Sequence, residues 1–363
     1  MKRKLSVKKI SIFILSVLII SILICCLIYN LKINAVTKKS VEVEFKVENG
    51  SNYYTIADKL YDEGLIKSKL CYKLYVKFNK PKALGAGLYK LNKNMSVKKI
   101  IDALEKGNSR NPDAITLTFK EGKNMRWIAN YIEKNTNNKE DDVFSLLNDK
   151  EYLKELINTY WFLTDDILND SIYYSLEGYL YPNTYDFKNK NVTVKEIFKT
   201  LLDEEEKKLK DLKSSIESNK YSIHQIITLA SIIELEAGKS NDKPGIAAVF
   251  YNRLNSNMPL GSDVTTYYAA KIDLNERDIT VQEVNDINAY NTRSSTMAGK
   301  LPIGPICNPT VDSIKAVLNP ESNDYYFFVA DKNGNTYFTK NYQEHLAKVV
   351  QLKKDGLWYT YEN

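Results

Sequence analysis

The chain has 363 residues and a formal net charge of +6, from 51 lysines and arginines against 45 aspartates and glutamates. The basic excess is spread over segments of mixed sign, so it gives little support to a nucleic-acid partner. Four cysteines, with Cys25 and Cys26 inside an apolar run, exclude a disulfide scaffold. The histidines, His224 and His345, lack the spacing of a zinc site, so we expect neither a metal nor a cofactor.

The N-terminal segment predicts a membrane anchor. Residues 1–9 are basic, and residues 10–29 form an uncharged run that would be about 30 Å long as a helix, enough to cross a bilayer. Because most of the flanking lysines precede the run, the positive-inside rule places the N-terminus in the cytoplasm and the chain beyond about residue 30 outside. A cleaved signal peptide is the alternative, but the run is long and no A-x-A site closes it.

Strand and helix patterns alternate after the anchor. We predict strands at Val41–Val47 and Gly87–Leu91 and helices at Tyr54–Glu63 and Val97–Lys106, the second helix capped by Ser96. Their size and order suggest a compact α+β domain, residues 41–108, of the kind that can bind polysaccharide. A spacer that holds the next domain off the membrane is the alternative, since a fold alone does not give function.

The middle of the chain offers a loop and a long charged helix. Residues 176–187 combine Glu177, a glycine and several aromatic residues including Tyr185, and we expect a loop there that could wall a groove. The helix predicted at Val194–Ser218 is dense in lysine and glutamate, which is typical of a solvated amphipathic element.

An apolar helix predicted at Ile226–Gly238 carries two carboxylates, Glu234 and Glu236, into its last turn. The two side chains diverge by about 200° around a helix, so they cannot both face one cleft. Glu236 follows aliphatic residues at positions i−7, i−4 and i−3, whereas the matching set for Glu234 includes a serine. The sets are Leu229, Ile232 and Ile233 for Glu236, and Ile227, Ala230 and Ser231 for Glu234.

These surroundings predict different chemistry for the two glutamates. A carboxyl held against aliphatic side chains has a raised pKa, which suits a general acid near neutral pH, and this favours Glu236 as the catalyst. The alternative is that both are solvated flanks of a buried helix. Beyond them we predict a helix at Pro244–Asn255, a loop at Met258–Tyr268 and a β-hairpin of residues 325–330 and 336–339.

Six motifs occur in a characteristic order. They are Glu-Gly-Tyr-Leu-Tyr-Pro-Asn-Thr-Tyr (177–185), Ala-Ser-Ile-Ile-Glu-Leu-Glu-Ala (230–237), Val-Phe-Tyr-Asn-Arg-Leu (249–254), Tyr-Asn-Thr (290–292), Leu-Pro-Ile-Gly-Pro-Ile (301–306) and Tyr-Phe-Phe-Val-Ala (326–330). Their order resembles the endolytic murein transglycosylases of the YceG-like family, and the resemblance covers about residues 41–350.

The resemblance implies a membrane-anchored lytic transglycosylase that cuts nascent peptidoglycan strands between MurNAc and GlcNAc. It implies an α+β chain with a LysM-like module ahead of a lysozyme-like, mainly helical catalytic domain with a β-hairpin, and peptidoglycan synthases as partners at the cell membrane. The expected parts are a cytoplasmic tail (1–9), a transmembrane helix (10–29), a linker (30–40), the LysM-like module (41–108), the catalytic region (109–352) and a tail (353–363).

The resemblance also implies roles for single residues. The family's catalytic glutamate is the second of its Glu-x-Glu, which is Glu236 here, with Glu234 in a supporting role. The candidates to contact the sugar are Asp263, Thr265, Tyr290, Asn291, Glu177 and Tyr185. Each of them could instead be a hydrogen bonder that stabilises a loop.

Two positions depart from the family pattern. Where the family usually has Leu-Gln-Ser/Thr-Asp-Pro-Thr, this chain has Leu-Gly-Ser-Asp-Val-Thr at 260–265, which loses the glutamine and the proline. Arg293 replaces the last tyrosine of the family's Tyr-Asn-Thr-Tyr, so we expect the aromatic contact there to be missing or replaced by a charge-assisted bond.

A single acid suffices for the implied reaction. Glu236 would protonate the glycosidic oxygen and then take the proton of the MurNAc C6 hydroxyl, which closes a 1,6-anhydro ring. A non-catalytic peptidoglycan-binding scaffold and a hydrolase are the alternatives. A serine or cysteine hydrolase has little support, because neither histidine lies near a recognisable nucleophile motif.

Overall fold

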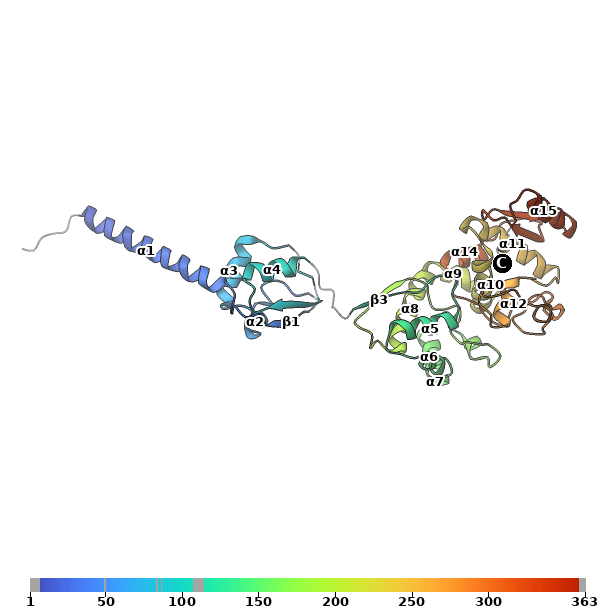
Figure 1. Ribbon diagram of the computed structural model, residues 1–363, viewed down its shortest axis with the longest axis horizontal. Coiled ribbons are helices and arrows are strands. Elements are labelled where there is room, and N and C mark those ends of the chain that lie inside the picture. The colour runs from blue at the N-terminus through green and yellow to red at the C-terminus, as the bar shows by residue number, and fades with distance from the viewer. Residues whose placement is uncertain (1–6, 49, 83, 86, 107–113, 359–363) are drawn as a thin grey trace, which may run out of the picture. The chain divides into compact units, whose positions relative to one another are not determined.

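The computed structural model describes residues 7–48, 50–82, 84–85, 87–106 and 114–358. The chain divides into two compact units, residues 1–114 and 115–363 (Figure 1). Each unit has its own hydrophobic core. Helices and short two-stranded sheets make up both units, which confirms the predicted α+β class. The expected module boundary at Asn108 lies outside the described residues.

The first unit begins with α1 (Val7–Ile33). Within it, Phe13–Ile33 has a mean hydropathy of 2.7, and the most apolar stretch of this segment has no buried residue, although Ile33 at its end packs against the core of the first unit. This helix is long and apolar enough to cross a bilayer, and it is therefore a candidate membrane anchor or signal sequence.

The rest of the first unit is a small α+β body. Its elements are β1 (Glu42–Val47), α2 (Ala57–Asp62), α3 (Lys69–Asn79), β2 (Gly87–Asn92) and α4 (Val97–Glu105). β1 and β2 pair antiparallel, with Phe45 opposite Tyr89, and both of these side chains are buried. Ser96 caps α4 as predicted, but α3 was not anticipated. Its start is fixed by Ser68, whose side chain accepts a hydrogen bond from the Cys71 amide.

The second unit is mainly helical. Its elements are β3 (Ile115–Thr118), α5 (Met125–Asn135), α6 (Glu140–Leu147), α7 (Lys150–Thr159), η1 (Asp165–Leu168), β4 (Thr184–Phe187), α8 (Val194–Leu209), η2 (Lys210–Leu212), α9 (Lys213–Glu217), α10 (Ile223–Glu236), η3 (Ser240–Asp242), α11 (Lys243–Asn255), α12 (Asp263–Ala269), α13 (Val281–Val284), η4 (Ser295–Met297), α14 (Val311–Leu318), β5 (Phe327–Ala330), β6 (Thr336–Thr339) and α15 (Tyr342–Lys354). β3 pairs antiparallel with β4, and β5 with β6, the latter pair forming the predicted hairpin.

Helix α10 is the buried centre of this unit. Every residue from Ile223 to Ile233 except Gln225 is buried, and α11 and α14 pack against the helix (Figure 1). Ser222 and Gln225 form a capping box at its first turn, which fixes where the helix starts. A helix that is apolar on all sides is expected to be surrounded by other elements. The last turn of α10 therefore places Glu234 and Glu236 where neighbouring elements enclose them.

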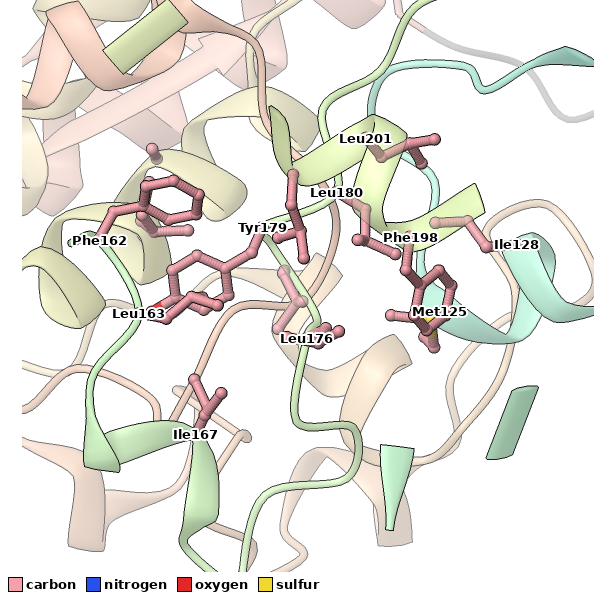
Figure 2. Close-up of a cluster of buried hydrophobic side chains, with 14 of the residues drawn as sticks. Met125, Ile128, Phe162, Leu163, Ile167, Leu176, Tyr179, Leu180, Phe198 and Leu201 are labelled. Carbon is pink, nitrogen blue, oxygen red and sulfur yellow. The ribbon is translucent and has the colours of Figure 1, made fainter. Parts of the chain in front are cut away.

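A second group of side chains supports α10 from the N-terminal part of the unit. Figure 2 shows Met125 and Ile128 of α5 close to Phe198 of α8, and Phe162 close to Tyr179. The chain makes its turn beside Tyr179 at Gly178, whose φ is +88° and where an added Cβ would lie 2.5 Å from the Pro305 Cβ. Only glycine fits this turn without displacing the neighbouring segment.

Three predictions differ from the structure. The helix expected at Val194–Ser218 is divided into α8, η2 and α9; it is amphipathic as predicted, with Ile197, Phe198, Leu201 and Leu202 buried and most of its lysines and glutamates exposed. The loop expected at Met258–Tyr268 contains α12, and the stretch at 176–187 ends in β4. Threonine and tyrosine are weak helix formers, so it is the buried side of α12 that makes this segment helical.

Candidate active site

Glu234 lies in an enclosed, polar environment at the end of α10. Its Oε2 accepts hydrogen bonds from the Thr310 amide (2.9 Å), the Thr310 hydroxyl (2.8 Å) and the Ser313 hydroxyl (2.5 Å). Lys243 of α11 places its Nζ 3.1 Å from the same oxygen, and the two side chains are only 7% and 6% exposed. Burial alone would raise the pKa of Glu234, but the hydrogen bonds and the Lys243 charge outweigh it and lower that pKa.

Glu236 lies in different surroundings, two residues further on. Its side chain is partly buried, and its Oε1 accepts a hydrogen bond of 2.5 Å from the Ser262 hydroxyl. Burial and the Asp263 charge raise the pKa of Glu236 and together exceed the opposing effects of Ser262, Arg253 and Arg293. A raised pKa is what the sequence led us to expect, and the alternative that both glutamates are solvated is wrong.

Ser262 is held in place by a chain of hydroxyl groups. Its amide donates to the Thr292 hydroxyl (3.0 Å), and its carbonyl accepts from the Thr265 hydroxyl (2.7 Å). The Thr265 and Thr292 hydroxyls are themselves 2.7 Å apart, and both residues are fully buried. Thr265 therefore stabilises the loop that presents Ser262 to Glu236.

Two arginines surround the same carboxyl. Arg253 of α11 is fixed by backbone carbonyls, since its Nε donates to Tyr326 (2.6 Å) and its Nη1 donates to Leu260 (2.5 Å). Arg293 forms an ion pair with Asp263 at the start of α12, and both side chains are well exposed. Where the family has a tyrosine, Arg293 thus forms a charge-assisted bond, which is one of the two outcomes expected from the sequence.

Asn291 and Tyr290 have their polar atoms engaged within the fold. The Asn291 side chain accepts from the Thr266 hydroxyl (2.8 Å) and donates to three backbone carbonyls, those of residues 283, 284 and 286. The Tyr290 hydroxyl accepts from the Tyr173 amide (3.1 Å). These contacts are those of loop-stabilising residues, the alternative that the sequence left open for them.

Glu177 and Tyr185 lie in the core rather than on a groove wall. Glu177 is 2% exposed, and its Oε2 accepts from the Met125 amide and the Tyr268 hydroxyl. Burial raises its pKa to about 8 against these hydrogen bonds, so it is protonated at neutral pH. The Tyr185 side chain is 8% exposed, and its hydroxyl donates to the Tyr181 carbonyl.

A cavity of about 420 Å³ borders the other side of the end of α10. Its wall includes Glu234, Leu235 and Ala237, together with Gly122–Asn124, Trp127, and Tyr267–Tyr268 of α12, but not Glu236. Three lysines face it, Lys123, Lys239 and Lys243. In the described part of the chain, no three His, Cys, Asp or Glu side chains are grouped as metal ligands would be.

Several residues of the site were not singled out in the sequence. They are Lys243, Arg253, Ser262, Thr292, Thr310 and Ser313. Arg253 and Thr292 lie within quoted motifs, and Ser262 lies in the quoted stretch 260–265, so membership of these stretches was an available signal for the three residues. The partners of Glu234 come from segments up to 79 residues away, and no local pattern reveals them.

The YceG-like family model matches residues 45–351, most of the chain. The chain belongs to the YceG-like family. The resemblance identified from the motifs is thereby confirmed. Among curated proteins, the chain is 35% identical over 304 residues to the endolytic murein transglycosylase of Bacillus subtilis strain 168, a match that covers 84% of this chain and 82% of the relative.

Two further family relatives extend the comparison. The endolytic murein transglycosylase of Streptococcus pneumoniae serotype 2 is 31% identical over 336 residues, which cover 88% of this chain and 60% of that longer protein. The crystal structure of a YceG-like protein from Listeria monocytogenes is 32% identical, with a TM-score of 0.59 over 85% of this chain and 100% of that one.

The different environments of the two glutamates predict unequal effects of their substitution on stability. Glu234→Gln leaves the buried Lys243 ammonium without its countercharge, and we expect it to lower the free energy of unfolding by about 3–5 kcal/mol. Glu236→Gln removes a carboxyl that has one hydroxyl partner and a raised pKa and belongs to no buried ion pair, so we expect a change of less than about 1 kcal/mol. Urea unfolding of both variants at neutral pH measures the change in the free energy of unfolding. Equal decreases in the two variants would contradict the assignment of Glu234 to a buried ion pair and Glu236 to a site without one.

Proposed function

We propose that this chain is a membrane-anchored endolytic lytic transglycosylase that cleaves peptidoglycan between MurNAc and GlcNAc. The observation that carries the proposal is the Glu236 carboxyl, whose raised pKa and single hydroxyl partner suit a proton donor, in a chain of the YceG-like family. The names of the curated relatives support the same activity.

In the first step, Glu236 gives its proton to the glycosidic oxygen that leaves MurNAc. Because the Ser262 hydroxyl donates to Oε1, the proton to be transferred lies on Oε2, and the carboxyl is held in one orientation. Departure of the sugar leaves an oxocarbenium-like centre at C1 of MurNAc.

In the second step, the Glu236 carboxylate accepts the proton of the MurNAc C6 hydroxyl, whose oxygen attacks C1 and closes the 1,6-anhydro ring. The positive charges of Arg253 and Arg293 favour the carboxylate during this interval, because both lower its pKa. The nucleophile belongs to the substrate, so no second carboxylate is needed opposite Glu236. The exposed Asp263–Arg293 pair is the candidate contact for sugar hydroxyl or N-acetyl groups.

The proposal extends to the parts of the chain. Residues 10–29 would be an uncleaved single-pass anchor with a cytoplasmic N-terminus, residues 41–108 a LysM-like module, and residues 109–352 a lysozyme-like catalytic region. The apolar α1 and the separate core of the first unit support this division. Enzymes that polymerise glycan at the same membrane, the peptidoglycan synthases, are the expected partners.

The products distinguish this function from its alternatives. We expect the protein to release glycans with 1,6-anhydroMurNAc ends from murein, and Glu236→Gln to lower turnover at least about 100-fold because the amide has no proton to transfer. Mass spectrometry of the released glycans is the measurement. Reducing ends would indicate a hydrolase, and the absence of any release by the unmodified chain would indicate a binding scaffold.

The pH profile tests the role of Ser262. Glu236 must be protonated to act, so kcat/KM falls as the pH rises through its raised pKa. The Ser262 hydrogen bond lowers that pKa, and Ser262→Ala should therefore move the alkaline limb to higher pH. Ser294→Ala is the control, since Ser294 is a buried serine that bonds Thr296 instead. An alkaline limb that stays in place or moves to lower pH in Ser262→Ala would contradict this role.

A further inference from the structure

One face of α3 in the first unit is apolar and basic; it is exposed at Leu70, Lys77 and Phe78 and half-buried at Lys73 and Leu74. Leu70, Lys73, Leu74, Lys77 and Phe78 recur at the i, i+3, i+4, i+7, i+8 spacing, which places them on one side of the helix. Leu70 is 69% exposed and Phe78 is 74% exposed, while the opposite side of α3 is buried in the core. Large apolar side chains on an exposed helix face indicate a binding surface.

The chain that carries this face is strongly basic, and the acids beside it, Asp58 and Asp62 of α2, lie against Lys69, with Asp58 also within electrostatic range of Lys73. Residues 64–101 contain ten lysines and no aspartate or glutamate. Lys69 is paired with Asp58 of α2 at 2.8 Å, but in the described part of the chain no ion pair joins Lys73 or Lys77 to an acid. Lysine side chains beside an apolar stripe can keep their ammonium groups in water while their stems cover apolar surface. This face of α3 therefore suits a partner that has an apolar interior and an anionic surface.

The position of α3 identifies that partner. Lys67, just before α3, donates its Nζ to the Leu31 carbonyl of α1 (3.3 Å), and Tyr29 of α1 lies within electrostatic range of Cys71 and Tyr75. Tyr29 is four residues, about 6 Å along the helix, before the end of the apolar segment at Ile33. Helix α3 thus lies level with the last turn of the candidate membrane span.

We propose that the Leu70–Phe78 face of α3 docks onto anionic lipid headgroups of the membrane that α1 crosses. Leu70, Leu74 and Phe78 enter the interface, and Lys73 and Lys77 bind the phosphates. The first unit is then held against the bilayer at two places, by α1 and by α3. The inference rests on the proposed membrane anchor and is independent of glycan cleavage.

The experiment measures depth at single positions in the full-length chain in lipid nanodiscs. Cys25, Cys26 and Cys71 are replaced by alanine, a nitroxide is attached at Phe78→Cys, and its collisions with oxygen and with a water-soluble nickel chelate are compared. The buried Cys307 thiol is not expected to react. Bilayers containing phosphatidylglycerol are compared with bilayers of phosphatidylcholine alone.

Two labelled positions serve as references. Glu48→Cys, at the exposed end of β1, reports a water-facing site, and Ile20→Cys reports the interior of the span. In phosphatidylglycerol we expect position 78 to collide more with oxygen and less with nickel than position 48 does. Lys73→Glu/Lys77→Glu should lower the ratio of docked to undocked α3 by more than about 20-fold, whereas the exposed pair on α4, Lys98→Glu/Lys99→Glu, should leave α3 docked.

Each other result overturns the proposal in a recognisable way. A nickel accessibility at position 78 equal to that at position 48 in phosphatidylglycerol means that α3 faces water. Low collision rates with both oxygen and nickel mean that protein, not lipid, covers the face. A water-exposed label at Ile20→Cys means that α1 does not cross the bilayer, so the anchor fails and the docking fails with it, while the proposed chemistry of Glu236 is untouched.

Discussion

The buried ion pair between Glu234 and Lys243 is the interaction on which the candidate site depends. It joins the last turn of α10 to the first residue of α11, and hydrogen bonds from Thr310 and Ser313 add α14 to the same carboxylate. Separating the two side chains would leave an unpaired charge inside the protein. This free-energy cost holds the ion pair in its geometry. Because α10 cannot rotate without breaking it, the direction of Glu236 is fixed as well.

One helix turn thus gives two carboxyl groups opposite properties. Four donors hold the charge of Glu234. Glu236 has one hydroxyl donor and the nearby charges of Asp263, Arg253 and Arg293, and the two arginines form their bonds with backbone carbonyls and with Asp263. The partners of Glu234 all belong to the fold, whereas Glu236 is the carboxyl that we propose exchanges a proton with the substrate. Glu177, protonated in the core, shows that burial alone raises a glutamate pKa without making a site.

The sequence predicted the elements whose pattern is local. The apolar repeat of α10, the Ser96 cap and the β5–β6 hairpin were all visible because neighbouring residues determine them. The helical state of α12 was missed, since its threonines and tyrosines favour helix only once they are buried. The contacts of Asn291 and Glu177 were also out of reach, because a motif gives the identity of a residue but not the direction of its side chain.

The central claim is that Glu236 is neutral and Glu234 ionised under the same conditions. Infrared difference spectra between the unmodified chain and each glutamine variant measure this directly, and they subtract the other protonated carboxyls, such as Glu177. We predict that, at a pH just above the ordinary range for glutamate, Glu236→Gln removes a protonated carboxyl band and Glu234→Gln removes a carboxylate band. A carboxylate band lost in both variants would contradict the account.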